Sequence, residues 1–183
     1  MAQWLAFVTL SGVVVYISRA SLRVPGSHGF YRFFAWECIL ALFVLNVLVW
    51  FQSPLAWYQI ISWILLVGSL VPLLLGVRTL TRRGQPTAQR EGEPQLLAFE
   101  KTTALVTSGI YGYIRHPLYS SLLFLTWGIF FKDPNGLTGV LAVAATTFLY
   151  LTAKADEAEC LRFFGLAYRD YMAKTRRFVP FFF

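Results

Sequence analysis

The chain has 183 residues, of which 57% are hydrophobic and 14% are charged, and it carries a net charge of +7. With a mean hydropathy of +0.57, this composition excludes an ordinary soluble domain and indicates a protein of the lipid bilayer. The basic residues lie in short segments between apolar runs, which favours contact with anionic lipid over binding of nucleic acid. The two cysteines, Cys38 and Cys160, show no metal-ligand spacing, so neither a disulfide framework nor a metal site is expected.

Three apolar runs occupy the first part of the chain, at residues 4–17, 33–51 and 55–77. The second and third reach the roughly 20 residues that cross a ~30 Å hydrocarbon core, and residues 52–54 are expected to form the turn between them. The first run lacks a basic leader and a convincing cleavage site, so we expect a retained helix. A polar stretch at residues 78–101 contains glycines and prolines and predicts an exposed connection.

Two further apolar runs, residues 118–131 and 136–153, flank a turn at residues 132–135 and predict a helical hairpin. The first of these runs covers only about 21 Å at 1.5 Å per residue. Its helix must therefore begin before Pro117, or the bilayer must thin locally. Of the two, we favour a hairpin that dips through thinned membrane.

The predicted fold class is all-α, a polytopic membrane protein with about five transmembrane helices and a C-terminal interfacial helix. We expect one membrane domain, made of a three-helix scaffold (residues 1–77), a cytoplasmic connection (78–104) and a C-terminal unit with the hairpin and the last helix (105–183). Five crossings place every Lys and Arg on one side except Lys132. The positive-inside rule then predicts a cytoplasmic C-terminus, in the inner membrane of a bacterium or archaeon or in the endoplasmic reticulum of a eukaryote.

A first polar cluster, LVTSGIYGYIRHPLY at residues 105–119, precedes and enters the predicted hairpin. It contains two glycines, three tyrosines, an arginine and a histidine. Arg115 and His116 would serve as interfacial anchors in a structural interpretation, and Pro117 would be an ordinary first-turn helix residue. The same residue types also suit a binding site at the membrane surface.

A second cluster, at residues 155–171, follows the hairpin. Phe164, Tyr168 and Tyr171 recur at helical spacing and predict an aromatic stripe on one helix along the interface. Three acids, including Asp156 and Glu157, crowd the expected start of that helix. They would either stabilise a helix N-terminus or, beside a partly dehydrated surface, attract a cationic ligand such as a sulfonium.

Together the strings LVTSGIYGYIRHPLY and DEAECLRFFGLAYRDY, with a hairpin between them and an Arg-Phe-Val-Pro sequence at 177–180, resemble the isoprenylcysteine carboxyl methyltransferases and their phospholipid methyltransferase relatives. The resemblance covers residues 105–180. It implies an integral membrane enzyme that uses S-adenosylmethionine in a pocket roofed by the C-terminal helix, with a substrate entrance open to the membrane. The implied acceptor is lipid-like, such as the carboxylate of an isoprenylated cysteine, and the implied partners are prenylated substrates and membrane lipids.

The resemblance also assigns roles to individual residues. Those that match the family's cofactor-binding segments are Leu105, Val106, Tyr111, His116, Pro117, Leu118, Tyr119, Asp156 and Glu157. Arg177 matches the arginine of an Arg-x-x-Pro ending and is expected to hold the acceptor, with Lys154 or Lys174 sharing this task. A carboxylate acceptor needs no proton acceptor, whereas an amine or hydroxyl would make Glu157 or Glu159 the candidate base.

Two other functions compete with this interpretation. The NADPH-dependent sterol-type membrane reductases look similar around an Arg-x-Pro-Asn-Tyr motif, but this chain has Leu118 in place of the Asn. A non-enzymatic scaffold would use its basic loops only to bind anionic lipid or a partner. Glu37, inside the second apolar run, is either a functional acid of the membrane interior or a partner of Arg32.

Overall fold

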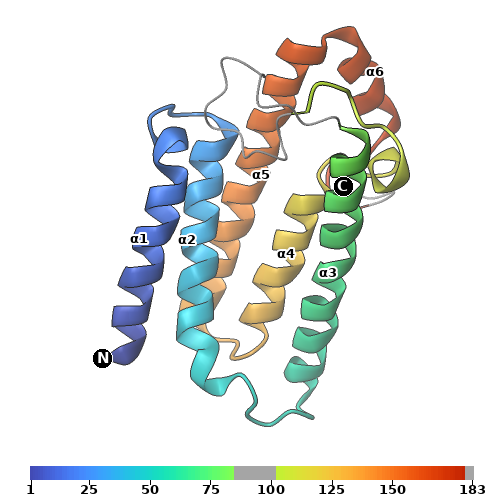
Figure 1. Ribbon diagram of the computed structural model, residues 1–183. Helices are drawn as coiled ribbons and strands as arrows, with labels where there is room; N and C mark the ends of the chain where they lie inside the picture. Colours follow the sequence, from blue (N-terminus) through green and yellow to red (C-terminus); the bar gives the residue numbers. More distant parts are fainter. Residues whose placement is uncertain (85–101, 180–183) are drawn as a thin grey trace.

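The computed structural model describes residues 1–84 and 102–179 of the chain, which form an all-α bundle (Figure 1). The helices are α1 (Ala2–Leu22), α2 (His28–Asn46), α3 (Trp57–Arg83), α4 (Pro117–Phe130), α5 (Gly136–Phe164) and α6 (Leu166–Lys174), with short 3₁₀ turns η1 (Val47–Val49) and η2 (Gly109–Gly112).

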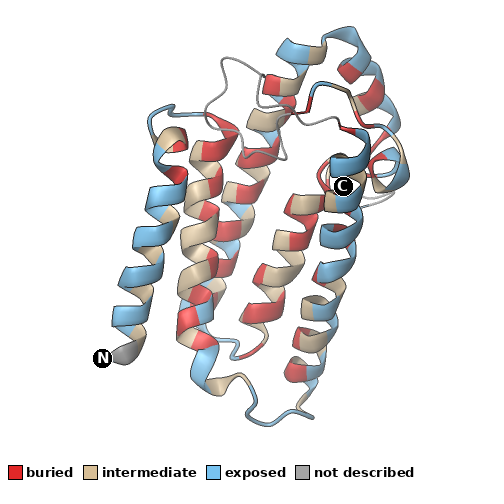
Figure 2. Cartoon of the chain, in the orientation of Figure 1, coloured by how far each residue is buried: buried red, intermediate tan, exposed pale blue. Residues whose placement is uncertain are grey.

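Among the described residues, four helices are long and apolar enough to cross a membrane: α1, α2 continued by η1, α3 and α5. The fifth apolar helix, α4, has 14 residues and packs against α2, α3 and α5. Helix α1 contacts α2 and leaves most of its remaining surface exposed, while the buried faces of α2, α4 and α5 turn inward (Figure 2). The chain is therefore a polytopic membrane protein with a short helix inside the bundle.

Several helix boundaries differ from the expectations. Helix α3 continues to Arg83, so the first residues of the predicted connection are helical, and residues 85–101 lie outside the described part. Helix α4 begins at Pro117, which excludes the earlier start that would have lengthened it. Proline suits the first helical position because its missing N–H has no partner there in any case.

Helix α5 corrects the expectation for the second polar cluster. The hairpin helix does not end near residue 153 but continues to Phe164, so Asp156 and Glu157 lie inside a 29-residue helix. The prediction that these acids sit at a helix start is therefore wrong. Gly165, with φ of 59°, ends α5 and turns the chain into α6. The expected aromatic stripe is split at this corner.

The core between α2, α4 and α5 combines large and small side chains. Ile39 and Leu42 of α2 pack with Ile129 of α4 and with Ala142 and Ala145 of α5. Alanine allows helix backbones to approach closely, which is how helices pack in lipid. The contact between α2 and α5 is as extensive as that between α3 and α4, and these are the two most extensive helix contacts among the described residues.

The turn between α4 and α5 closes one end of the bundle around a buried cation. Lys132 is 1% exposed, and its Nζ lies 3.5 Å from the centroid of the Trp63 ring and 5.1 Å from that of Trp50. Its Nζ also donates to Gln59 Oε1 at 3.0 Å, and Gln59 Nε2 donates back to the Lys132 carbonyl at 2.9 Å. The hairpin is thereby fastened to α3.

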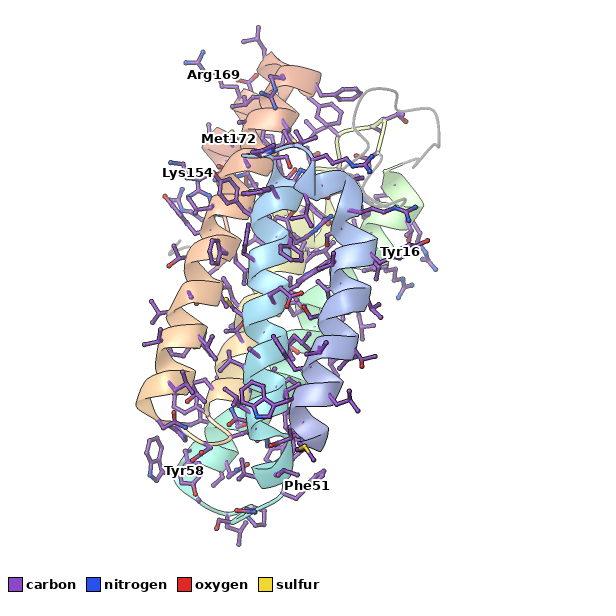
Figure 3. All side chains as sticks on the ribbon, turned by 90° about the vertical axis from the view of Figure 1, so that its left-hand side faces the viewer. Tyr16, Phe51, Tyr58, Lys154, Arg169 and Met172 are labelled. Carbon is purple, nitrogen blue, oxygen red and sulfur yellow. The ribbon has the colours of Figure 1, made fainter. Side chains whose placement is uncertain are left out.

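Charged residues of the C-terminal region gather at the opposite end. Figure 3 shows Phe51 and Tyr58 at one end of the molecule and Lys154, Arg169 and Met172 at the other. Helix α5 passes beyond α4 at this second end and carries α6 there (Figure 1).

Candidate active site

The segment before α4 and the C-terminal tail run side by side at the α6 end of the bundle. Arg115 N donates to Arg176 O at 2.8 Å, and His116 N donates to Arg177 O at 3.1 Å. Arg176 N returns a bond to Tyr113 O at 3.1 Å, which completes a short parallel bridge. The tertiary structure thus joins two motifs that are far apart in the sequence.

A cavity opens beside this bridge, with about 820 Å³ of space that no protein atom fills, part of it open to the surroundings. Eight of the nine residues predicted to hold a cofactor line it: Leu105, Val106, Tyr111, His116, Pro117, Leu118, Tyr119 and Asp156. The ninth, Glu157, does not. Most of the wall is apolar or aromatic, so its few charged groups determine which ligand it favours.

The cavity also has lining residues that the sequence did not assign to the cofactor, although Glu159 was considered as a base and Phe164, Tyr168 and Tyr171 as an aromatic stripe. They are His28, Leu80, Thr102, Arg115, Glu159, Cys160, Phe164, Tyr168 and Tyr171. Helical spacing from Asp156 was a usable signal for Glu159 and Cys160, which lie three and four residues further along α5. No local pattern indicated His28, because it reaches the cavity only through the packing of α2 on α5.

Asp156 is the carboxylate most open to the cavity. Its side chain is 25% exposed, against 5% for Glu157. One oxygen lies 3.4 Å from His116 Nδ1, and the other accepts a weak bond from Cys160 Sγ at 3.6 Å. An acid with an exposed edge in a mainly apolar wall is suited to a cationic ligand, because attraction between opposite charges strengthens as the dielectric constant falls.

Glu157, the next residue, points into a network of cations. Arg177 donates to it through Nη2 at 2.7 Å and Nε at 3.1 Å, and Arg115 Nε donates at 2.8 Å. His116 Nε2 lies 3.3 Å from the same carboxylate. Arg115 also donates to the carbonyls of Met172 and Thr175. Glu157 therefore holds the C-terminal segment in place through Arg177 and does not form part of the cavity wall.

Arg177 lies between this network and a second, apolar groove. Its guanidinium is stacked 5.0 Å from the centroid of the Tyr150 ring, and its side chain is 20% exposed. Tyr150 and Phe178 both line the groove, which continues along α4 past Phe124 to Phe131. Ser120 Oγ donates to Phe178 O at 2.8 Å and holds the tail against α4. Arg177 thus lies beside the apolar groove, against Tyr150, which lines it.

The two lysines considered for the acceptor lie elsewhere. Lys154 is exposed, with its Nζ 5.9 Å from the Tyr150 ring, and Lys174 is exposed at the end of α6. Neither lines the cavity or the groove. Glu37 is also remote from the cavity: its Oε2 accepts a bond from Ser11 Oγ at 2.8 Å, between α1 and α2.

The electrostatics of the site favour a protonated His116. Burial lowers the pKa of His116, but hydrogen bonds and charges from Asp156 and Glu157 outweigh it, and the pKa is raised above its ordinary value. The hydrogen bonds that Arg177 donates to Glu157 likewise raise the pKa of Arg177. Burial raises the pKa of Tyr168 and Tyr171, so both phenols stay protonated. Tyr171 uses its hydroxyl to donate to Tyr111 O at 2.7 Å.

Comparison with known proteins agrees with the two motifs. The family model for phospholipid methyltransferases matches residues 93–171. The protein-S-isoprenylcysteine O-methyltransferase of Mus musculus is 32% identical over 81 residues, which cover 44% of this chain and 29% of that protein. The Homo sapiens protein of the same name is 32% identical over 82 residues, covering 44% of this chain and 28% of that protein. The matched region is thus less than a third of these relatives, and no solved structure matches.

These matches confirm the resemblance to the isoprenylcysteine carboxyl and phospholipid methyltransferases that the sequence indicated. The residues that the family model matches include all the lining residues of the cavity except His28 and Leu80. The findings support a membrane methyltransferase.

Proposed function

We propose that this chain transfers the methyl group of S-adenosylmethionine to a lipid-like acceptor, and that the reacting group of the acceptor is a carboxylate such as that of an isoprenylated cysteine. The observation that carries the proposal is Asp156, a carboxylate with an exposed edge in a cavity lined by seven other residues of the expected cofactor segments. S-adenosylmethionine supplies a methyl group activated by a positive sulfur.

The cavity residues fit this ligand by type. Tyr111, Tyr119 and Leu118 offer apolar and aromatic surface for an adenine ring and an alkyl chain. Asp156 offers the negative charge that a sulfonium or an ammonium group requires. The ring of His116 stacks on Tyr119 at 5.3 Å between centroids and donates toward Asp156, which keeps that carboxylate oriented.

Arg177 is suited to bind the head group of the acceptor. A guanidinium grips a carboxylate through two parallel bonds, and its partial exposure leaves donors available beyond those that Glu157 occupies. The groove beyond Tyr150 and Phe178 offers apolar surface for the attached chain. Holding both reactants in line contributes up to about 7–11 kcal/mol of the barrier reduction, and an apolar groove excludes water from the reaction.

The geometry favours a carboxylate acceptor over an amine or a hydroxyl. An amine or hydroxyl must lose a proton to a nearby base. Glu157 is unsuited because two guanidinium groups and an imidazole surround its oxygens. Glu159 is paired with His28 at 2.5 Å. A carboxylate nucleophile is already deprotonated and needs neither acid.

The proposal is tested with purified protein in nanodiscs, titrated separately with S-adenosylmethionine and NADPH. We expect saturable binding of the first and none of the second. Asp156→Asn should weaken that binding at least tenfold, whereas Asp133→Asn, an exposed acid at the opposite end, should not change it. Transfer of a labelled methyl group to a prenylcysteine and not to an aminophospholipid would support the carboxylate acceptor. Binding of NADPH alone would overturn the proposal.

The proposal includes the orientation of the site, with the α6 end in the cytoplasm. It is motivated by the basic residues gathered there, of which Lys154, Arg162 and Arg169 are exposed. Two variants that lack Cys38 and Cys160 would each carry one new cysteine, at position 162 or at position 133. Each cysteine would report on which side of the membrane its end of the bundle lies. In intact cells an impermeant thiol reagent should label position 133 and spare position 162. The reverse pattern would show the opposite orientation.

A further inference from the structure

A buried pair connects the N-terminal half of the chain to the cavity. His28, the first residue of α2, is 1% exposed, and its Nδ1 lies 2.5 Å from Glu159 Oε2. The backbone N–H of His28 donates to the other oxygen, Oε1, at 3.0 Å. Glu159 thus receives two bonds from one residue and caps the start of α2 from another helix. Ser27, the N-cap of α2, accepts from Phe30 N at 3.2 Å and completes the cap.

Both members of the pair lie on the cavity wall. Glu159 is three residues from Asp156 on α5 and therefore shares its face of the helix, and Cys160 follows on the same wall. His28 lies outside residues 93–171, the part that the family model matches. The comparisons therefore give this residue no role.

We propose that His28 and Glu159 are a positioning pair of the cofactor site, which holds the start of α2 against α5 and so keeps the wall around Asp156 closed. This role in cofactor binding rests on the proposed function. Without the imidazole, the buried carboxylate of Glu159 loses the contact with His28 Nδ1 and keeps the bond from the His28 backbone N–H. A buried ion without adequate partners is unfavourable. The carboxylate regains solvation by moving toward water, which separates α2 from α5 at the cavity.

The opening is expected to stay local. Below the pair, α2 and α5 remain joined by the core of Ile39, Leu42, Ala142 and Ala145. Ends of elements with few apolar contacts open at lower free energy than the core does. Loss of the pair should therefore open the cavity without unfolding the helical bundle.

The two cysteines provide a direct measurement. Cys160 lines the cavity, whereas Cys38 packs beside the core of α2. In His28→Ala, labelling of Cys160 by a small neutral maleimide should accelerate at least fivefold, with the rate at Cys38 unchanged. His28→Asn retains a donor near the position of Nδ1 and should restore the slow rate. In the same variants, affinity for S-adenosylmethionine should fall at least tenfold in His28→Ala and recover in His28→Asn.

A matched control removes a similar bond away from the cavity. Ser11→Ala deletes the hydrogen bond to the carboxylate of Glu37 between α1 and α2. It should leave both the labelling of Cys160 and the cofactor affinity at wild-type values. If Ser11→Ala changes them as much as His28→Ala does, the effect is a general loosening of the bundle and the proposal is wrong.

The remaining outcomes separate this inference from the proposed function. A slow, unchanged rate at Cys160 in His28→Ala would overturn the positioning role, even if the melting temperature falls. A different outcome is that His28→Ala accelerates labelling of Cys160 and His28→Asn returns it to the slow rate, but the protein binds no S-adenosylmethionine. The pair would then still hold the cavity wall closed, and its assignment to this cofactor would be wrong.

Discussion

The two ends of the bundle both bury charge, but in different ways. At the hairpin turn, Lys132 is 1% exposed, with its ammonium enclosed by two tryptophans and one glutamine. At the α6 end, Glu157 is as well paired, yet its neighbours Asp156 and Arg177 keep 25% and 20% of their side chains exposed. One end is closed, and the other leaves charged groups available.

The difference distinguishes charged residues that only hold helices together from charged residues that bind a ligand. A charge that only fastens helices together is best fully enclosed, because every contact with water competes with its partners. A charge that binds a ligand must keep one side open and be oriented from the other side. At the α6 end this orientation comes from Glu157 and His116, which hold Arg177 and Asp156 respectively. Four variants test whether the two ends differ in this way.

The largest effect is expected from Glu157→Gln. A neutral amide leaves Arg115 and Arg177 without their shared anion, and breaking a buried ion pair from one side costs about 3–5 kcal/mol of folding free energy. Both the thermal stability in detergent and the turnover should fall, with turnover reduced at least a hundredfold. A variant that binds cofactor weakly but melts like the wild type would show that Glu157 holds the cofactor directly and contributes little to folding.

The next effect is expected at the closed end, from Lys132→Met. The substitution preserves volume but leaves Gln59 Oε1 without its donor, which costs roughly 1–3 kcal/mol, and it removes the cation–π contact, worth up to about 2 kcal/mol in a desolvated site. The melting temperature should drop while the turnover of the folded protein stays normal. Adding Gln59→Leu removes the unpaired amide and should recover part of the stability. A loss of turnover in Lys132→Met would show that the two ends are coupled.

A smaller effect is expected from Arg177→Lys. Lysine keeps the positive charge, which suffices to anchor anionic lipid, but it lacks the planar fork that grips a carboxylate. Turnover should fall about tenfold, which corresponds to about 1.4 kcal/mol in the barrier, with unchanged affinity for S-adenosylmethionine. Near-normal turnover would remove Arg177 from the acceptor site. Lys174→Arg, at an exposed position on α6, is the matched control and should change neither quantity.

The smallest effect is the dependence of stability on pH through His116. Its pKa in the folded protein is raised above the ordinary value of 6.5, because Asp156 and Glu157 favour the protonated ring. The stabilising contribution is therefore fully present below about pH 6.5 and is lost as pH rises through the folded pKa. The melting temperature should decline over that interval in the wild type and decline less in His116→Gln. An equal slope in both proteins would assign the pH dependence to other groups.

The sequence by itself determined the fold class and the chain segments that line the candidate site. The apolar runs predicted the membrane helices, because crossing lipid requires long segments without charge, and this requirement is visible locally. The motif at residues 105–119 contributed eight residues that line the cavity, seven of them predicted to do so, because it forms one continuous segment along the cavity wall. Polar residues at a turn, such as Asn135, also predicted the hairpin, where the side chain of Asn135 accepts from Thr138 N at 3.1 Å.

Only the tertiary structure decided which acids serve which purpose. Asp156 and Glu157 look equivalent as neighbours in the sequence, but consecutive residues of a helix point about 100° apart. The continuation of α5 through this region therefore turns Asp156 to the cavity and Glu157 to the tail arginines. His28 joins the site only because α2 packs against α5. Contacts between distant segments depend on how whole helices pack, and no local pattern around either residue carries that information.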